Sequence, residues 1–89
     1  MERTLDVSEL EPPEPLERAL ATAESLTPGA FVRMTHRRYP CLLEAQLAER
    51  GFRCIILGDD EDDFVEAFIW RDGDEAGEAA ARRRMEGKG

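Results

Sequence analysis

The densest group of chemically capable side chains lies between positions 36 and 41. His36, Arg37, Arg38, Tyr39 and Cys41 fall within this stretch. Guanidinium groups and the N–H groups at helix starts are common donors to carboxylates and phosphates. The group therefore predicts a binding site for a small anion or another small ligand. The simpler alternative is a solvated polar loop whose histidine ends a strand.

Cys41 adds a second chemical possibility. A cysteine in the first turn of a helix and near arginines has a lowered thiol pKa. Cys41 would then act as a nucleophile or sulfur acceptor, with His36 as its proton partner, although no third group of a nucleophilic constellation is visible. Alternatively, Cys41 is a small apolar residue beneath the loop. Cys54 is predicted to be a core residue, too far from Cys41 for a disulfide.

Four strands and two helices are expected to position this group. The strands are predicted at 3–7, 30–36, 52–58 and 64–71, and the helices at 13–26 and 41–50. The first helix carries apolar residues at three- and four-residue spacing, which is typical of one buried stripe. Pro13 and Pro40 suit the first turns of the helices, and Gly29 and Gly51 suit the turns that follow them.

The order βαβαββ predicts an α/β protein, specifically an α+β two-layer sandwich. Two right-handed crossovers place both helices on one face of a mixed four-stranded sheet. If the first two strands are parallel neighbours in the sheet, both helix starts lie at the same sheet edge. Open sheets commonly bind ligands at that edge, and the loops at 8–12 and 36–40 would flank it.

The last strand is apolar on both faces, as in strands that are buried on both sides. One face carries Val65, Ala67 and Ile69, and the other carries Phe64, Phe68 and Trp70. Since the two helices cover one face only, we expect an open aromatic patch on the other. Such patches mark interfaces. The preferred interpretation is a homodimer through this face; the alternatives are a partner domain, or the chain after residue 71 folding back over the sheet.

Composition limits the function classes. The chain has 89 residues and a net charge of −8, which disfavours nucleic acid as a partner. No long apolar run is present, so we expect no membrane span and a cytoplasmic location. One histidine and two separated cysteines disfavour a metal centre, and the acidic run 59–63 is interpreted as a solvated hairpin tip. Residues 72–89 are predicted to be a flexible charged tail, or a frayed helix.

The N-terminal residues resemble the TusA/SirA-like superfamily of sulfur carriers. Those proteins begin with Leu-Asp, a short turn and Leu, followed by Cys-Pro-x-Pro at the first helix. The matching residues here are Leu5-Asp6, Leu10 and Pro12-Pro13-Glu14-Pro15. The resemblance places Pro12 at the position of the persulfide-carrying cysteine. It therefore implies that the known sulfur transfer does not occur at that position.

Residues 1–71 as a whole resemble one branch of that superfamily, the domain-of-unknown-function family 2249. The shared features are the Pro-Pro-Glu-Pro start, His36, Pro40 and the pair Gly51-Phe52. The resemblance implies a TusA-like fold with strand order 1-2-4-3 and an antiparallel fourth strand. It implies no established activity. Members are described as neighbours of, or fusions to, redox and hemerythrin-like domains, which suggests a redox protein partner.

These observations favour a non-catalytic binding or interaction module without a cofactor. The predicted ligand residues are His36, Arg37, Arg38, Tyr39 and Cys41, and the ligand would be a small anion. The alternative function is a sulfur-relay or thiol redox protein that uses Cys41. A third interpretation is a purely structural dimerisation domain.

Overall fold

The computed structural model describes residues 1–38, 40, 42–58, 61 and 63–87. Seven elements follow one another along the chain: β1 (Glu2–Asp6), α1 (Glu14–Glu24), β2 (Phe31–His36), α2 (Leu43–Glu49), β3 (Phe52–Leu57), β4 (Val65–Arg71) and α3 (Glu75–Glu86). The first six have the predicted order βαβαββ, and their boundaries lie within a few residues of those expected. The helix α3 lies in the segment predicted to be a flexible tail or, as the alternative, a frayed helix; the structure shows a helix there.

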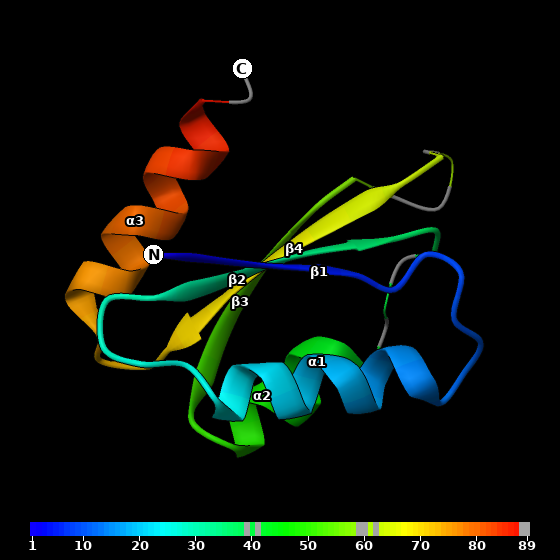
Figure 1. The fold of residues 1–89 in the computed structure, drawn as a ribbon, viewed down its shortest axis with the longest axis horizontal. Helices are drawn as coiled ribbons and strands as arrows, with labels where there is room; N and C mark the ends of the chain where they lie inside the picture. The colour runs from blue at the N-terminus through cyan, green and yellow to red at the C-terminus, as the bar shows by residue number, and fades with distance from the viewer. Residues whose placement is uncertain (39, 41, 59–60, 62, 88–89) are drawn as a thin grey trace.

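The four strands form one mixed sheet in the order β1-β2-β4-β3, as predicted. β1 and β2 are parallel, with Leu5 opposite Met34, and β4 is antiparallel to β2 and to β3. α1 and α2 lie together on one side of the sheet (Figure 1), as two crossovers of the same hand require. The predicted α+β fold, with its strand order and both helices on one face, is confirmed.

A hydrophobic core fills the space between this helix pair and the sheet. α1 contributes Ala19 and Ala23, and α2 contributes Leu43 and Leu47; all four side chains are fully or almost fully buried. The four-residue spacing in each helix places its pair on one side. Strand residues with the same orientation complete the core: Val32, Met34, Ala67 and Ile69. The end of β2 is thereby fixed beneath the starts of both helices.

The opposite face of the sheet is covered by α3, and here the structure differs from the expected flexible tail. α3 lies across the sheet from α1 and α2 (Figure 1), so the molecule has three layers rather than two. Phe68 is 0% exposed and Trp70 is 2% exposed. Both pack with Phe31 and with Ala81 of α3 in a second core cluster. The expectation of an open aromatic patch is therefore wrong, and the alternative, in which the chain after residue 71 folds back over the sheet, is what the structure shows.

Phe64, the third residue of the expected patch, lies just before β4 and is 52% exposed. The Phe64 side chain is not part of the aromatic cluster that α3 covers. Phe64, Phe68 and Trp70 therefore do not form one surface, and a homodimer through the sheet face would have to displace α3. The expected dimer has no exposed aromatic surface of this kind in the part of the chain that the structure describes.

Small residues allow α3 to approach the sheet closely. Gly77 and Ala81 are buried on its inner side, with Met85 packed partly against the same cluster. A β-carbon at Gly77 would lie only 3.0 Å from the carbonyl oxygen of Ala30. The Arg82 guanidinium lies over the Trp70 ring, 5.8 Å from its centroid, where the ring quadrupole attracts a cation.

Asp74 fixes the start of α3. One carboxylate oxygen accepts a hydrogen bond of 3.0 Å from the Gly77 N–H, as an N-cap does, and the other accepts one of 2.8 Å from the Gly29 N–H. Gly29 lies in the turn before β2 with a positive φ of 84°, a conformation that glycine adopts without strain. These bonds lower the pKa of the Asp74 carboxyl, that of Gly29 most and that of Gly77 next.

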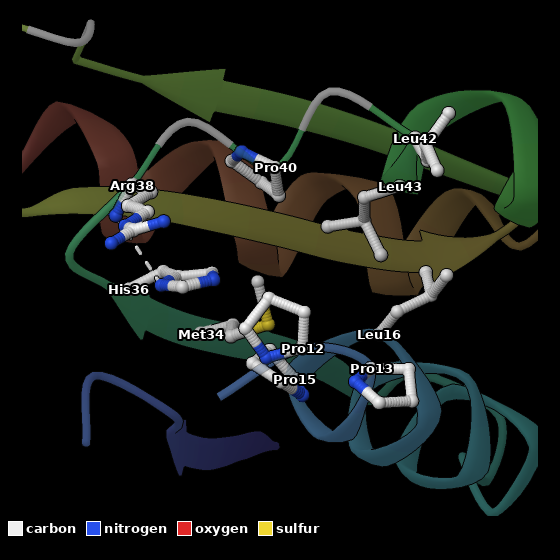
Figure 2. Close-up of a pocket in the computed structure, with 10 residues that line it drawn as sticks. All are labelled: Pro12, Pro13, Pro15, Leu16, Met34, His36, Arg38, Pro40, Leu42 and Leu43. Carbon is white, nitrogen blue, oxygen red and sulfur yellow. Dashed lines mark hydrogen bonds between the residues drawn. The ribbon is translucent and has the colours of Figure 1, made fainter. Parts of the chain in front are cut away.

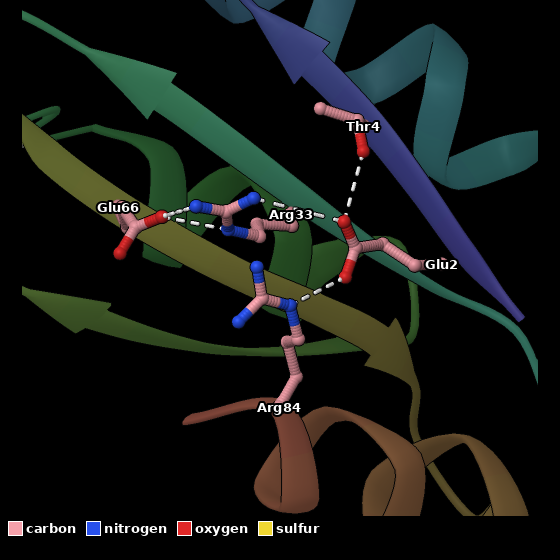
Figure 3. Close-up of polar contacts among 5 residues, drawn as sticks. All are labelled: Glu2, Thr4, Arg33, Glu66 and Arg84. Atoms are coloured by element: carbon pink, nitrogen blue, oxygen red, sulfur yellow. Dashed lines mark hydrogen bonds and ion pairs between the residues drawn. The ribbon is translucent and has the colours of Figure 1, made fainter. Parts of the chain in front are cut away.

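Ion pairs join α3 to the sheet at the other end of the helix. Arg84 donates to Glu2 of β1 at 3.0 Å. Arg33 of β2 binds Glu66 of β4 at 2.6 Å and lies 3.7 Å from Glu2 (Figure 3). The Arg33 and Glu66 side chains are only 22% and 14% exposed, so this pair is shielded from water and salt. β1, β2, β4 and α3 are thus connected on the face that bears the aromatic cluster.

Candidate functional site

The carboxyl ends of β1 and β2 lie at the same sheet edge, as expected from their parallel pairing. The chain leaves β1 through a turn and enters α1 at Glu14, and it leaves β2 toward α2. Asp6 shapes the first of these loops, because its carboxylate accepts hydrogen bonds from the Ser8 N–H at 2.9 Å and the Ser8 hydroxyl at 2.6 Å. These two bonds, followed by the charge of Arg37, lower the pKa of Asp6. The loop after β1 and the loop after β2 thus both begin at this sheet edge.

His36 is the chemical centre of this edge. It is the last residue of β2, points to the same face as Met34, and is only 9% exposed. Its Nδ1 atom accepts hydrogen bonds from the backbone N–H groups of Arg37, at 2.8 Å, and Arg38, at 3.3 Å. Since Nδ1 is an acceptor in both bonds, the neutral ring carries its proton on Nε2. Burial, and then the charge of Arg38, lowers the pKa of His36, which keeps the ring neutral at physiological pH.

The Nε2 atom of His36 points into a cavity of about 330 Å³ (Figure 2). Within the described part of the chain, no hydrogen-bond partner faces this atom. Among the described residues, no buried side-chain nitrogen or oxygen atom lacks a hydrogen-bond partner, so the Nε2–H group is accessible from the cavity. It is a donor that a molecule in the cavity, water included, can reach.

The walls of this cavity, here called the apolar pocket, are almost entirely hydrocarbon. α1 and the residues before it supply Pro12, Pro13, Pro15 and Leu16; Met34 comes from β2; Pro40, Leu42 and Leu43 come from the start of α2. Leu42 is 66% exposed and lies at the rim. The Arg38 guanidinium and the His36 ring are the charged and polar groups of the wall (Figure 2). The pocket suits a small apolar body with one polar end.

A second cavity of about 300 Å³ adjoins the apolar pocket and shares Pro12, His36 and Arg38 with it. It is here called the charged pocket. Its other walls come from the loop after β1 and from Arg37, and they include Glu9 and Glu11. Carboxylates and guanidinium groups thus line the same space.

The structure brings together three of the five predicted ligand residues. His36 and Arg38 line both pockets, and Arg37 lines the charged pocket. Tyr39 and Cys41 lie outside the described residues, so their predicted roles, including the sulfur relay through Cys41, stay predictions.

The predicted contribution of helix N–H groups is smaller than expected. Pro12, Pro13 and Pro15 have no N–H, and the Glu14 N–H already donates to the Glu11 carbonyl at 3.0 Å. α2 has only seven residues, with a correspondingly weak dipole. Donors at this edge therefore come mainly from His36 and the arginines.

Sequence reasoning missed the apolar wall. Pro13 and Pro40 were interpreted as helix starts and Pro12 as the position of the family's cysteine, and none of the three as part of an apolar wall. The sequence did contain a signal for this wall: several apolar residues lie next to the expected site in the stretches that form α1, β2 and α2. Their hydrophobic side chains converge where β2 ends and both helices begin.

Cys54 is not part of this site. It lies on β3, partly buried against the first core cluster, as predicted for a core residue. Burial, and next the charge of Glu44, raises the pKa of the Cys54 thiol to about 12. A thiol with such a pKa is almost entirely protonated at neutral pH and is a poor nucleophile.

Two further observations concern the residues that the structure describes. Among them, no group of three or more His, Cys, Asp and Glu side chains is arranged to hold a metal ion. None of the helices in the described ranges combines the length and apolar character needed to cross a membrane. The acidic run 59–63 lies mostly outside the described residues; β3 and β4 on either side of it form the predicted antiparallel hairpin.

Comparison with known proteins gives one match. A family model described as "Uncharacterized conserved protein (DUF2249)" matches residues 4–71. This range includes both pockets and the whole sheet except for the first residues of β1, and it ends before α3. No curated protein and no solved structure matches the chain.

Proposed function

The chain belongs to the DUF2249 family of uncharacterized conserved proteins, and on this premise we propose that it is a non-catalytic module that binds a small, largely apolar carboxylate. The ligand's hydrocarbon part occupies the apolar pocket, and its carboxylate meets His36 and Arg38. The observation that carries the proposal is the hydrocarbon-lined cavity, into which the Nε2–H group of His36 is directed without an acceptor among the described residues.

The size of the cavity supports a small ligand. Its volume of about 330 Å³ lies at the lower end of the range of roughly 300–1,000 Å³ found for small-molecule sites. A short branched or aromatic carboxylic acid fits such a volume, whereas a nucleotide or a large cofactor does not.

The polar groups support an anionic end on the ligand. The Nε2–H of His36 donates one hydrogen bond, and the Arg38 guanidinium adds a positive charge and further donors. A carboxylate accepts from both, and hydrogen bonds to ionised groups are about twice as strong as neutral ones. An uncharged amide of the same shape would lack that advantage.

The state of His36 favours binding over catalysis. A general base needs a free lone pair directed at the substrate. In His36 the Nδ1 lone pair accepts from two backbone N–H groups, and the nitrogen that faces the cavity carries the proton. The ring is therefore arranged as a fixed hydrogen-bond donor.

The resemblance to TusA-like sulfur carriers fits the same proposal. In that resemblance Pro12 occupies the position of the reactive cysteine, and Pro12 lines both pockets. We therefore propose that Pro12, at the position where a TusA-like sulfur carrier has its reactive cysteine, forms part of the wall of a binding pocket instead.

The proposal is tested by calorimetric titration with isocaproate, a branched carboxylate, and with its neutral amide. We expect isocaproate to bind and the amide to bind about tenfold more weakly, a difference of about 1.4 kcal/mol. Arg38→Met should remove most of the difference between the two probes. The matched control is Arg53→Met, because Arg53 is an exposed arginine on β3 that lines neither pocket.

Two results would contradict the proposal. One is an absence of binding by isocaproate to the wild-type chain at low salt. The other is equal binding of the acid and the amide, with no change in Arg38→Met, because the cationic end of the pocket would then have no role.

A further inference from the structure

The charged pocket is lined by both acidic and basic side chains. Glu9, Glu11, Arg37 and Arg38 all line it and are exposed. Among the described residues, none of these four forms an ion pair with another. Elsewhere on the surface such groups do pair, for example Arg50 with Glu24 at 2.8 Å. Both signs of charge are therefore available to a ligand in this space.

The apolar pocket opens beside these charges. The two cavities share Pro12, His36 and Arg38. The Nε2–H of His36 is directed into the cavity and has no acceptor among the described residues, so a ligand there can accept a hydrogen bond from it (Figure 2). A molecule that fills the apolar pocket must thus place its polar end next to Arg38 and in front of the glutamates.

The chemistry of a simple carboxylate uses only half of these groups. Its anionic end is attracted by Arg38, but Glu9 and Glu11 repel it across the charged pocket. An amine without a carboxylate has the opposite problem, because it faces two arginines. A ligand with an ammonium and a carboxylate on the same carbon satisfies both sets of charges at once.

We propose that the two pockets together bind a free α-amino acid with an apolar side chain. The side chain enters the apolar pocket, the carboxylate lies between the His36 Nε2–H and Arg38, and the ammonium faces Glu9 and Glu11. This inference rests on the proposed function, since it requires the apolar pocket to bind a carboxylate, and it adds the class of ligand.

Three related probes separate the contributions in calorimetric titrations at low salt. L-Leucine carries both charged groups, isocaproate lacks the ammonium, and isoamylamine lacks the carboxylate. All three have the same branched hydrocarbon end. We expect leucine to bind about fivefold more tightly than isocaproate, as exposed ion pairs allow, and isoamylamine to bind most weakly.

The double variant Glu9→Gln with Glu11→Gln tests the role assigned to the acidic groups. It should weaken leucine binding about fivefold while leaving isocaproate binding unchanged or tighter. The matched control is Glu14→Gln with Glu17→Gln, which removes two exposed charges from the first turn of α1 without changing either pocket wall. The control should weaken leucine less than twofold.

The outcomes distinguish this inference from the proposed function. If isocaproate binds and leucine binds no more tightly, or if both double variants have the same effect, the amino-acid ligand is excluded and the carboxylate site remains. If neither leucine nor isocaproate binds, both proposals are wrong. Tighter leucine binding that only the Glu9 and Glu11 variant removes supports the inference.

Discussion

Replacement of Ala81 by arginine tests whether α3 is a structural layer of the molecule. Ala81 is 0% exposed and packs against Phe31, Phe68 and Trp70. An arginine side chain has no room there and would have to bury its charge, so α3 should leave the sheet. The matched control is Ala79→Arg, since Ala79 is exposed on the same helix and the two variants have the same composition.

The expected loss of stability follows from the burial that α3 provides. Full burial of a large apolar side chain contributes about 1.5–3 kcal/mol. If α3 supplies roughly half of the burial of three aromatic side chains, its departure costs about 2–4 kcal/mol. For 89 residues, this is a large part of a total stability of roughly 4–13 kcal/mol. Ala79→Arg should change stability by less than about 0.5 kcal/mol.

Two measurements report on this change. Calorimetric melting should show a Tm lower by about 8–30 °C in Ala81→Arg. Trp70 is the single tryptophan of the chain and is 2% exposed, so its emission should shift to longer wavelength when α3 leaves. If Ala81→Arg matched Ala79→Arg in both Tm and emission, α3 would not pack on this face and the three-layer arrangement would be refuted.

Two further predictions concern charged groups that hold the layers together. Glu66→Gln leaves Arg33 with a weaker partner at a shielded position and should lower the free energy of unfolding in urea by about 1–3 kcal/mol. Arg53→Ala removes an exposed ion pair and should lower it by less than about 0.5 kcal/mol. Equal losses in the two variants would show that shielding from water does not strengthen the Arg33–Glu66 pair. Asp74→Asn should be less stable than the wild type at neutral pH. Because the folded pKa of Asp74 is lowered from 3.8 by the N–H of Gly29 first, its stabilisation is complete above that value and is lost as the pH falls through the lowered folded pKa. The variant should therefore lose less stability than the wild type in that acidic range, and parallel pH curves would contradict this assignment.

The sheet and its two helices could be predicted because local and global signals agreed. Leu16, Ala19 and Ala23 recur at helical spacing, and the prolines before them suit only a helix start or a turn. The strand order came from the family resemblance, and the structure has the same order. Such agreement between levels is typical of sequences that specify one fold.

The third layer was predicted only as an alternative, because α3 has few large apolar residues. Its inner side consists of Gly77, Ala81 and Met85 at four-residue spacing, a weak hydrophobic signal beside many charges. The stronger clue was on the sheet: Phe68 and Trp70 required a cover. Small residues on a helix and large residues on a sheet are complementary, but only their contact in space reveals it.

The candidate site was predicted in its polar half only. His36 and Arg38 were identified from their residue types, because such groups carry chemistry in any context. The hydrogen bonds of His36 Nδ1 depend on the backbone after β2, and therefore the direction of Nε2 could not be deduced from sequence. The same limitation applies to the pocket volume, which depends on how closely Pro15 and Leu43 approach across the edge.

The position of α3 has a practical consequence for protein production. The family match ends at Arg71, and its end invites the expression of a shortened chain that stops there. Such a chain would expose Phe31, Phe68 and Trp70 to water, and proteins with a bared aromatic sheet face are prone to aggregate. Any self-association of that fragment would be a product of truncation, so the recombinant protein should extend beyond Glu86, where the covering helix ends.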